Sequence, residues 1–346
     1  MIDGRILADA LRDPATASGL DADGWTALLA IARAEQLIGT LAHRLEGLPM
    51  PPAAARILED ARSSAAQDRT AALWEAEMAR RALASMGMPV ILLKGTAYAA
   101  AGLAAGTGRS IGDLDILVPR ARLDEAEAML LAAGWEWVKP DPYDDAYYRR
   151  WMHELPPLIH RERDRMIDVH HTILPLTARV TPDADALIAD SVLLKNGLRV
   201  LSPAGMVCHA AAHLFADGDL AGGLRNLWDI DQLVREFSER DPDFCLDVYE
   251  ESHTHGLMPA VMRAFRLAAA LYDTPVKGYS SPIKVTLKPQ RSDRFFFHRL
   301  LARNAWGRPT HRLTRLAFYL RSHAIRMPPH MLAKHLFIKS RKSRSV

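Results

Sequence analysis

The stretch Arg109–Pro119, RSIGDLDILVP, places two aspartates at the start of a run of branched aliphatic residues. Such a run, closed by a proline, predicts a buried strand, and side chains two residues apart in a strand share one face. Asp113 and Asp115 would therefore lie side by side, with Leu114 and Ile116 facing a core. Neighbouring buried carboxylates are unfavourable unless a cation compensates for them. The pair therefore indicates a site for Mg²⁺ or Mn²⁺, which bind oxygen ligands.

A third acid occupies a similar position further along the chain. In MIDVHH (Met166–His171), Asp168 lies between Ile167 and Val169, and the preceding PLIHR segment could form a hairpin with this strand. If the strand lies beside the first one, three carboxylates meet at one edge of a sheet. The third acid could then support a second metal ion or deprotonate an attacking hydroxyl. His170 would share the face of Asp168 and is a candidate residue of the cleft.

An apolar run upstream ends in LLKGTAY, which predicts a strand ending at Lys94–Gly95 and a helix beginning at Thr96. A glycine at such a junction lets the backbone approach a phosphate, and a helix N-terminus favours anions. Lys94, Gly95, Thr96 and Arg109 are therefore candidate nucleotide-binding residues. A D-x-D motif alone is equally typical of a surface turn or an ion pair. The order of strand, glycine, helix, arginine and acidic strands is more specific.

The surrounding sequence predicts an α/β core that is flanked by helical parts. Residues 1–85 have apolar residues at helical spacing, and short strands alternate with helices over residues 86–200. The chain returns to helix over residues 201–275, and a basic helical segment occupies residues 276–346. Residues 139–157 are polar and interrupted by prolines, which predicts a loop.

Charge is distributed unevenly along the chain. From Lys277 to Val346 there are 17 lysines and arginines against one acid, Asp293. Such a segment could bind nucleic acid, anionic lipid or an acidic peptide, or dock against the acidic remainder of its own chain. Only two cysteines are present, the N-terminus lacks the pattern of a secretory signal, and no apolar run is long enough to predict a transmembrane segment. These features predict a cytoplasmic protein.

Together the motifs resemble the nucleotidyltransferase superfamily that includes DNA polymerase β-like, poly(A) polymerase and aminoglycoside-nucleotidylating enzymes. They are most similar to a bacterial family of uncharacterised nucleotidyltransferases. The matching segments are ILLKG (91–95), Arg109, DLDILV (113–118), IDVHH (167–171) and RNLWDIDQL (225–233). The last segment places Asp229 at an acidic position of that family, which makes it a second candidate residue of the cleft.

The resemblance implies an α+β fold, in which helical parts flank a mixed β-sheet core, and a role for each matching residue. Asp113 and Asp115 would be metal ligands and Asp168 the third acid, while Gly95 and Thr96 would hold the phosphates of an NTP. The implied reaction is metal-dependent transfer of an NMP from the NTP to a hydroxyl or phosphate acceptor, with release of pyrophosphate. The acceptor could be a small molecule, a peptide, a protein or RNA. Two alternatives stay open: a nucleic-acid-binding or toxin–antitoxin-type module that uses the basic segment, and a peptide-tailoring enzyme that transfers a phosphoryl or glycosyl group.

Overall fold

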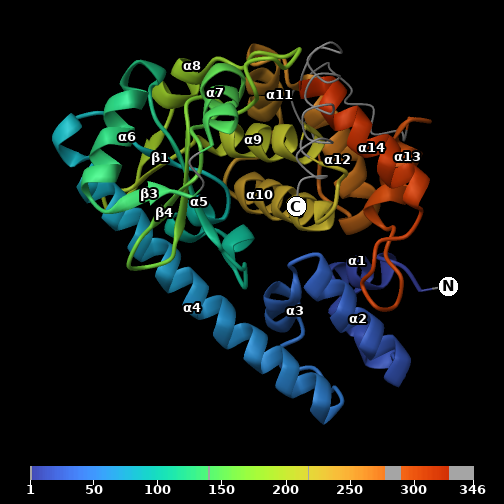
Figure 1. Cartoon of the computed structure of the whole chain (residues 1–346). Coiled ribbons are helices and arrows are strands. Elements are labelled where there is room, and N and C mark those ends of the chain that lie inside the picture. The colour runs from blue at the N-terminus through green and yellow to red at the C-terminus, as the bar shows by residue number, and fades with distance from the viewer. Residues whose placement is uncertain (1, 139–140, 217, 277–289, 327–346) are drawn as a thin grey trace.

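The computed structural model describes residues 2–138, 141–216, 218–276 and 290–326 (Figure 1). The polar stretch that begins at Lys277 and the last twenty residues of the basic segment lie outside this description. The helices are α1 (Arg5–Arg12), α2 (Ala22–Ala34), α3 (Ile38–Arg44), α4 (Pro52–Ala82), α5 (Lys94–Ala100), α6 (Leu123–Ala132), α7 (Pro142–Trp151), α8 (Ala184–Ala189), α9 (Pro203–Ala216), α10 (Gly223–Arg240), α11 (Phe244–Thr254), α12 (Met258–Tyr272), α13 (Asp293–Leu300) and α14 (Arg312–Arg326). The strands are β1 (Ile91–Leu92), β2 (Asp113–Leu117), β3 (Trp135–Trp137), β4 (Leu158–His160), β5 (Met166–His170), β6 (Val192–Leu193) and β7 (Arg199–Val200).

The strands form one mixed sheet in the order β3-β4-β5-β2-β1-β7-β6. β2 runs parallel to β5, and β1 runs parallel to β7, whereas the other neighbouring strands are antiparallel. Leu114 and Ile116 of β2 are buried, as the apolar run predicts. The α+β fold with a mixed sheet and helical flanks is therefore confirmed, and so is the hairpin of β4 and β5.

Helices before and after the sheet in the sequence complete one hydrophobic core with it. Figure 1 shows α4 as a long diagonal helix that runs from the side of α3 to the sheet, where it contacts α5 and β2. The loop after α5 approaches α3 very closely. A Cβ atom on Gly108, whose φ is +64°, would lie 2.4 Å from the carbonyl oxygen of Gly39. Glycine at both positions allows this approach, which places Arg109 next to the N-terminal helices.

The prediction of a loop over residues 139–157 is wrong, because α7 occupies Pro142–Trp151. The side chain of Asp141 accepts hydrogen bonds from the backbone N–H groups of Tyr143 (2.9 Å) and Asp144 (3.0 Å), and Pro142 stands in the first turn. Prolines and acids at these positions begin a helix rather than prevent one. Residues 139–140 lie outside the described part of the chain.

The described part of the basic segment docks against the acidic body of the protein, one of the alternatives that its charge leaves open. Arg303 Nε lies 2.7 Å from Glu35 Oε1. Arg299 and Arg315 both pair with Asp219, at 3.1 Å and 2.6 Å. Several of its positive charges are therefore neutralised within the fold. Of the helices in the described ranges, none combines the length and apolar character that crossing a membrane requires.

Candidate active site

Three carboxylates meet on the adjacent strands β2 and β5. In the parallel pairing of these strands Asp115 stands directly opposite Asp168, and Asp113 precedes Asp115 by two residues. One oxygen of each carboxylate lies within 4.8 Å of the others. Asp113 is exposed, Asp168 half-buried and Asp115 buried. The structure therefore brings together the three acids that the sequence singles out, in a donor set that suits a hard divalent cation.

The three acids differ in their electrostatic surroundings. Burial tends to raise the pKa of Asp115, but Lys94 and His170 outweigh this effect and hold the pKa well below its ordinary value. Desolvation, followed by the charges of Asp115 and Glu154, raises the pKa of Asp168 to about 7. Desolvation and the Asp115 charge also raise the pKa of Asp113. Like-charge repulsion thus remains uncompensated at two of the three acids, and a bound cation would relieve it.

Lys94 provides the main positive charge beside Asp115. Its Nζ lies 2.6 Å from Asp115 Oδ1, and His170 Nε2 lies 3.0 Å from the same oxygen. Lys94 is the first residue of α5 and has a φ of +51°, a conformation that is uncommon for a residue with a side chain. Lys94, a predicted phosphate-binding residue, is thus paired with a carboxylate. Lys94 also lines a cavity that Asp113 borders.

Gly95 makes room for the side chain of Arg109. A Cβ atom at Gly95 would lie 2.4 Å from Arg109 Nε. The group that approaches the backbone at this glycine is therefore the guanidinium of Arg109, where the sequence predicted a phosphate. Arg109 forms an ion pair with Asp229 of α10, and Arg225 Nη1 donates to the other oxygen of that carboxylate at 3.2 Å. Asp229 is buried, so this predicted cleft residue acts on the site through Arg109.

Two of the candidate residues are less accessible than the sequence suggests. Thr96 is buried, and its Oγ1 has no hydrogen-bond partner among the described residues. It is not among the residues that line the cavity at the acidic edge, although Gly95 beside it is. His170 is also buried and reaches the site through its contact with Asp115. Phosphate binding by Thr96 stays a prediction.

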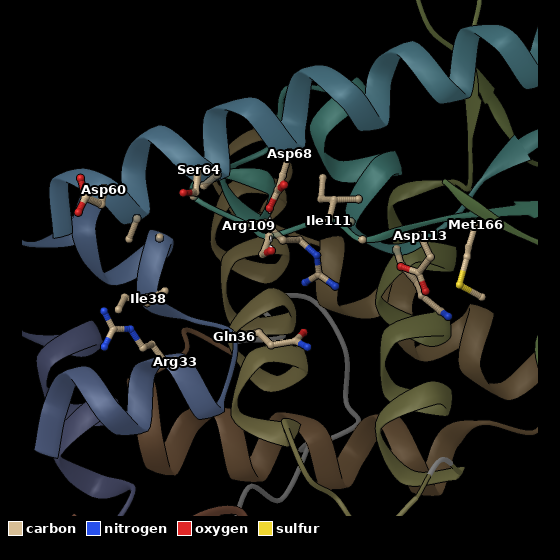
Figure 2. Close-up of a pocket in the computed structure, with 18 of the residues that line it drawn as sticks. Arg33, Gln36, Ile38, Asp60, Ser64, Asp68, Arg109, Ile111, Asp113 and Met166 are labelled. Carbon is tan, nitrogen blue, oxygen red and sulfur yellow. Dashed lines mark hydrogen bonds between the residues drawn. The ribbon is translucent and has the colours of Figure 1, made fainter. Parts of the chain in front are cut away.

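A cavity of about 780 Å³ extends from the acidic edge of the sheet to the N-terminal helices. Figure 2 shows Asp60, Ser64 and Asp68 of α4 facing the space above Arg33 and Gln36, with Asp113 at the far end. We call this space the α4 cavity; its other lining residues include Lys94, Gly95, Arg109, Ser110, Ile111, Asp115 and Met166. Its volume lies within the range of about 300–1,000 Å³ that is typical of sites for small molecules.

Comparison with family models matches residues 21–273 to a family described as "Uncharacterised nucleotidyltransferase". The chain belongs to this family. A search among curated proteins returns no match. The region matched to the nucleotidyltransferase family contains the three acids, the ion pair between Arg109 and Asp229, and the α4 cavity. The cavity wall formed by α3 and α4 is thus part of the nucleotidyltransferase region and not an appendage to it.

The sequence did not indicate that the N-terminal helices contribute to this candidate site. Asp60, Ser64 and Asp68 are spaced by four residues, which places them on one face of α4. This spacing could have identified the face, but polar helix faces are usually solvated, so it does not indicate a cavity. His153 and Glu154 were also missed, because they lie in the stretch that was expected to be a loop.

Proposed function

We propose that this protein is a divalent-metal-dependent nucleotidyltransferase that moves an NMP from an NTP to the hydroxyl or phosphate group of an acceptor. The observation that carries the proposal is the meeting of three carboxylates on adjacent parallel strands, two of which, Asp113 and Asp115, line the α4 cavity. Membership of the nucleotidyltransferase family supports the same reaction class. The acceptor that we favour is a small molecule or a peptide, because a cavity of this size holds ligands of that kind.

Asp113, Asp115 and Asp168 would hold Mg²⁺ or Mn²⁺, since their clustered carboxylate oxygens fit the ligand preference of these ions. The ion would supply Lewis-acid activation of the phosphates and neutralise the charge that develops on them. Lys94 and Arg109, which line the cavity beside the acids, would bind phosphate oxygens and orient the NTP.

In the reaction, the acceptor oxygen attacks the α-phosphorus in line with the pyrophosphate. One P–O bond forms, the bond to the leaving pyrophosphate breaks, and an acceptor hydroxyl loses its proton. Among the acids Asp168 is half-buried and lies across from Asp115, and we assign it the role of accepting this proton. Catalysis would depend mainly on positioning and electrostatic stabilisation by the chain.

The test follows the fate of each phosphate. The full chain is incubated with a cell extract, Mg²⁺ or Mn²⁺, and each NTP labelled either at the α- or at the γ-phosphate. Nucleotidyl transfer labels an acceptor from α-labelled NTP only, whereas phosphoryl transfer labels it from γ-labelled NTP. The double variant Asp113→Asn with Asp115→Asn should lose the α-label transfer, and the control Asp190→Asn, at an exposed aspartate, should keep it.

Two results would refute the proposal: absence of α-label from every acceptor, or equal labelling by the double variant and the native chain. Treating the labelled product with nuclease or protease then identifies the class of the acceptor. Thermal unfolding of each variant verifies that lost transfer does not reflect a lost fold.

A further inference from the structure

A second group of side chains that could bind a metal lies next to the carboxylate triad, which it contacts through His170 and Asp115. His153, Glu154 and His170 each offer one ligand atom, and these atoms lie within 4.8 Å of one another. Glu154 Oε2 is 3.6 Å from His153 Nε2 and 3.5 Å from His170 Nε2. The two imidazole rings have centroids 5.1 Å apart. We call these three residues the histidine cluster.

Backbone pairing brings the histidine cluster together. The segment that follows α7 runs antiparallel to the end of β5, with a bridge between Glu154 and His170. His171 N–H donates to the carbonyl of His153 at 2.9 Å, and Leu155 N–H donates to that of Val169 at 2.9 Å. Glu154 and His170 therefore stand opposite each other by register, and His153 is adjacent in the chain.

The distances suit a small divalent ion. Ligand atoms bound at about 2.1 Å in a tetrahedron lie about 3.4 Å apart, close to both separations of Glu154 from the histidines. Two imidazoles with one carboxylate are ligands of Zn²⁺ and related transition metals, whereas Mg²⁺ prefers an all-oxygen shell. The Nδ1 atoms of His153 and His170 are buried without a hydrogen-bond partner among the described residues, so the polar contacts of both rings converge on the cluster side.

We propose that the histidine cluster is a second metal site, selective for a borderline ion of the Zn²⁺ class and distinct from the carboxylate triad. Asp115 connects the two sites, because its Oδ1 lies 3.0 Å from His170 Nε2. Asp115 therefore belongs to the triad and also contacts one member of the histidine cluster. An ion in the cluster would fix Asp115 in position and add positive charge next to the phosphate-binding residues.

The charges around the cluster favour a cation. Glu154 and Asp115 contribute two negative charges, and Lys94 beside Asp115 contributes one positive charge.

The experiment measures metal binding directly, without any reaction. The full chain is freed of metal with a chelator and titrated with Zn²⁺, in competition with Co²⁺, whose visible absorption reports nitrogen ligands. We expect one ion per chain to bind with an affinity that a millimolar excess of Mg²⁺ leaves unchanged. Glu154→Gln and His153→Gln should each weaken Zn²⁺ binding by about 100-fold or more.

Two control variants separate this site from the alternatives. His298→Gln removes an exposed histidine of α13 and should leave Zn²⁺ affinity unchanged. Asp113→Asn removes a ligand of the triad and should abolish α-label transfer while Zn²⁺ still binds. Native-like Zn²⁺ affinity in both cluster variants would overturn the proposal, as would displacement of Zn²⁺ by Mg²⁺. Because the readout is binding, failure of this proposal and failure of nucleotidyl transfer are observed separately.

Discussion

The half-buried carboxylate of Asp168 should make the stability of the metal-free protein fall as pH rises. Its pKa is raised from the ordinary value of 3.8 to about 7, by desolvation first and then by the charges of Asp115 and Glu154. Between these two values the native state keeps a proton that the unfolded chain has lost. The contribution of Asp168 to stability is therefore fully present below about pH 4 and is lost as pH rises through about pH 7.

The size of the effect follows from the pKa difference. At 1.36 kcal/mol for each pKa unit, the full penalty is about 4 kcal/mol above pH 7. At about pH 5 only part of it applies, about 2 kcal/mol. Asp168→Asn removes the charge but keeps the shape. Relative to the native chain, the variant should therefore gain about 2 to 3 kcal/mol more stability at pH 8 than at pH 5, seen as a larger free energy of unfolding.

Urea unfolding in the presence of a chelator, at both pH values, measures this difference. A constant cost of the asparagine itself cancels in the comparison, and Asp190→Asn, at an exposed aspartate, serves as the matched control. Saturating Mg²⁺ should remove most of the pH dependence of the native chain, because the ion compensates for the charges at the triad. A variant whose relative stability is the same at both pH values would refute the electrostatic account of Asp168.

Three further changes test individual contacts of the site. Lys94→Met should destabilise the metal-free chain by about 3 kcal/mol, because Asp115 keeps a buried charge without its partner. Mg²⁺ should restore the lost stability, and an unchanged midpoint of urea unfolding would contradict the pairing. Gly95→Ala should lower the melting temperature, since the new Cβ would lie 2.4 Å from a guanidinium nitrogen of Arg109. The control Gly19→Ala, where a Cβ would meet nothing within 4 Å, should leave it unchanged. Equal shifts in melting temperature for both variants would count against the close approach at Gly95. Ser64→Trp in the α4 cavity should weaken NTP binding at least about tenfold while changing the free energy of unfolding by no more than about 0.5 kcal/mol, and unaltered affinity would show that NTP does not enter this cavity.

Local periodicity was enough to predict the acidic edge of the sheet. Asp113 and Asp115 share a face because strand side chains alternate, and the apolar neighbours of Asp168 mark a second strand. The prediction assumed that these two strands lie side by side, and the sequence did not establish this pairing. Pairing depends on contacts between residues more than fifty positions apart, and single-strand patterns do not specify them.

Other features depend on tertiary contacts that leave no local pattern. The partner of Arg109 is Asp229, 120 positions further along the chain. The left-handed conformation of Lys94 could not be expected from its residue type, since such a φ is rare for lysine. His153 and Glu154 lie in a polar segment whose register against β5 places them at His170, and composition contains no information on register.

The same long-range contacts explain why the N-terminal helices belong to the site. Arg225 Nη2 donates to Thr40 Oγ1 at 2.6 Å and to the carbonyl of Gln36 at 2.8 Å, while its Nη1 donates to Asp229. Asp229 in turn holds Arg109 at the cavity wall. A movement of α3 would therefore pull on the carboxylate that positions Arg109. Removing one member of such a buried network leaves the others without partners, so α3 and the side of the cavity formed by Arg109 are energetically coupled. A ligand that fills the cavity between them would stabilise both together.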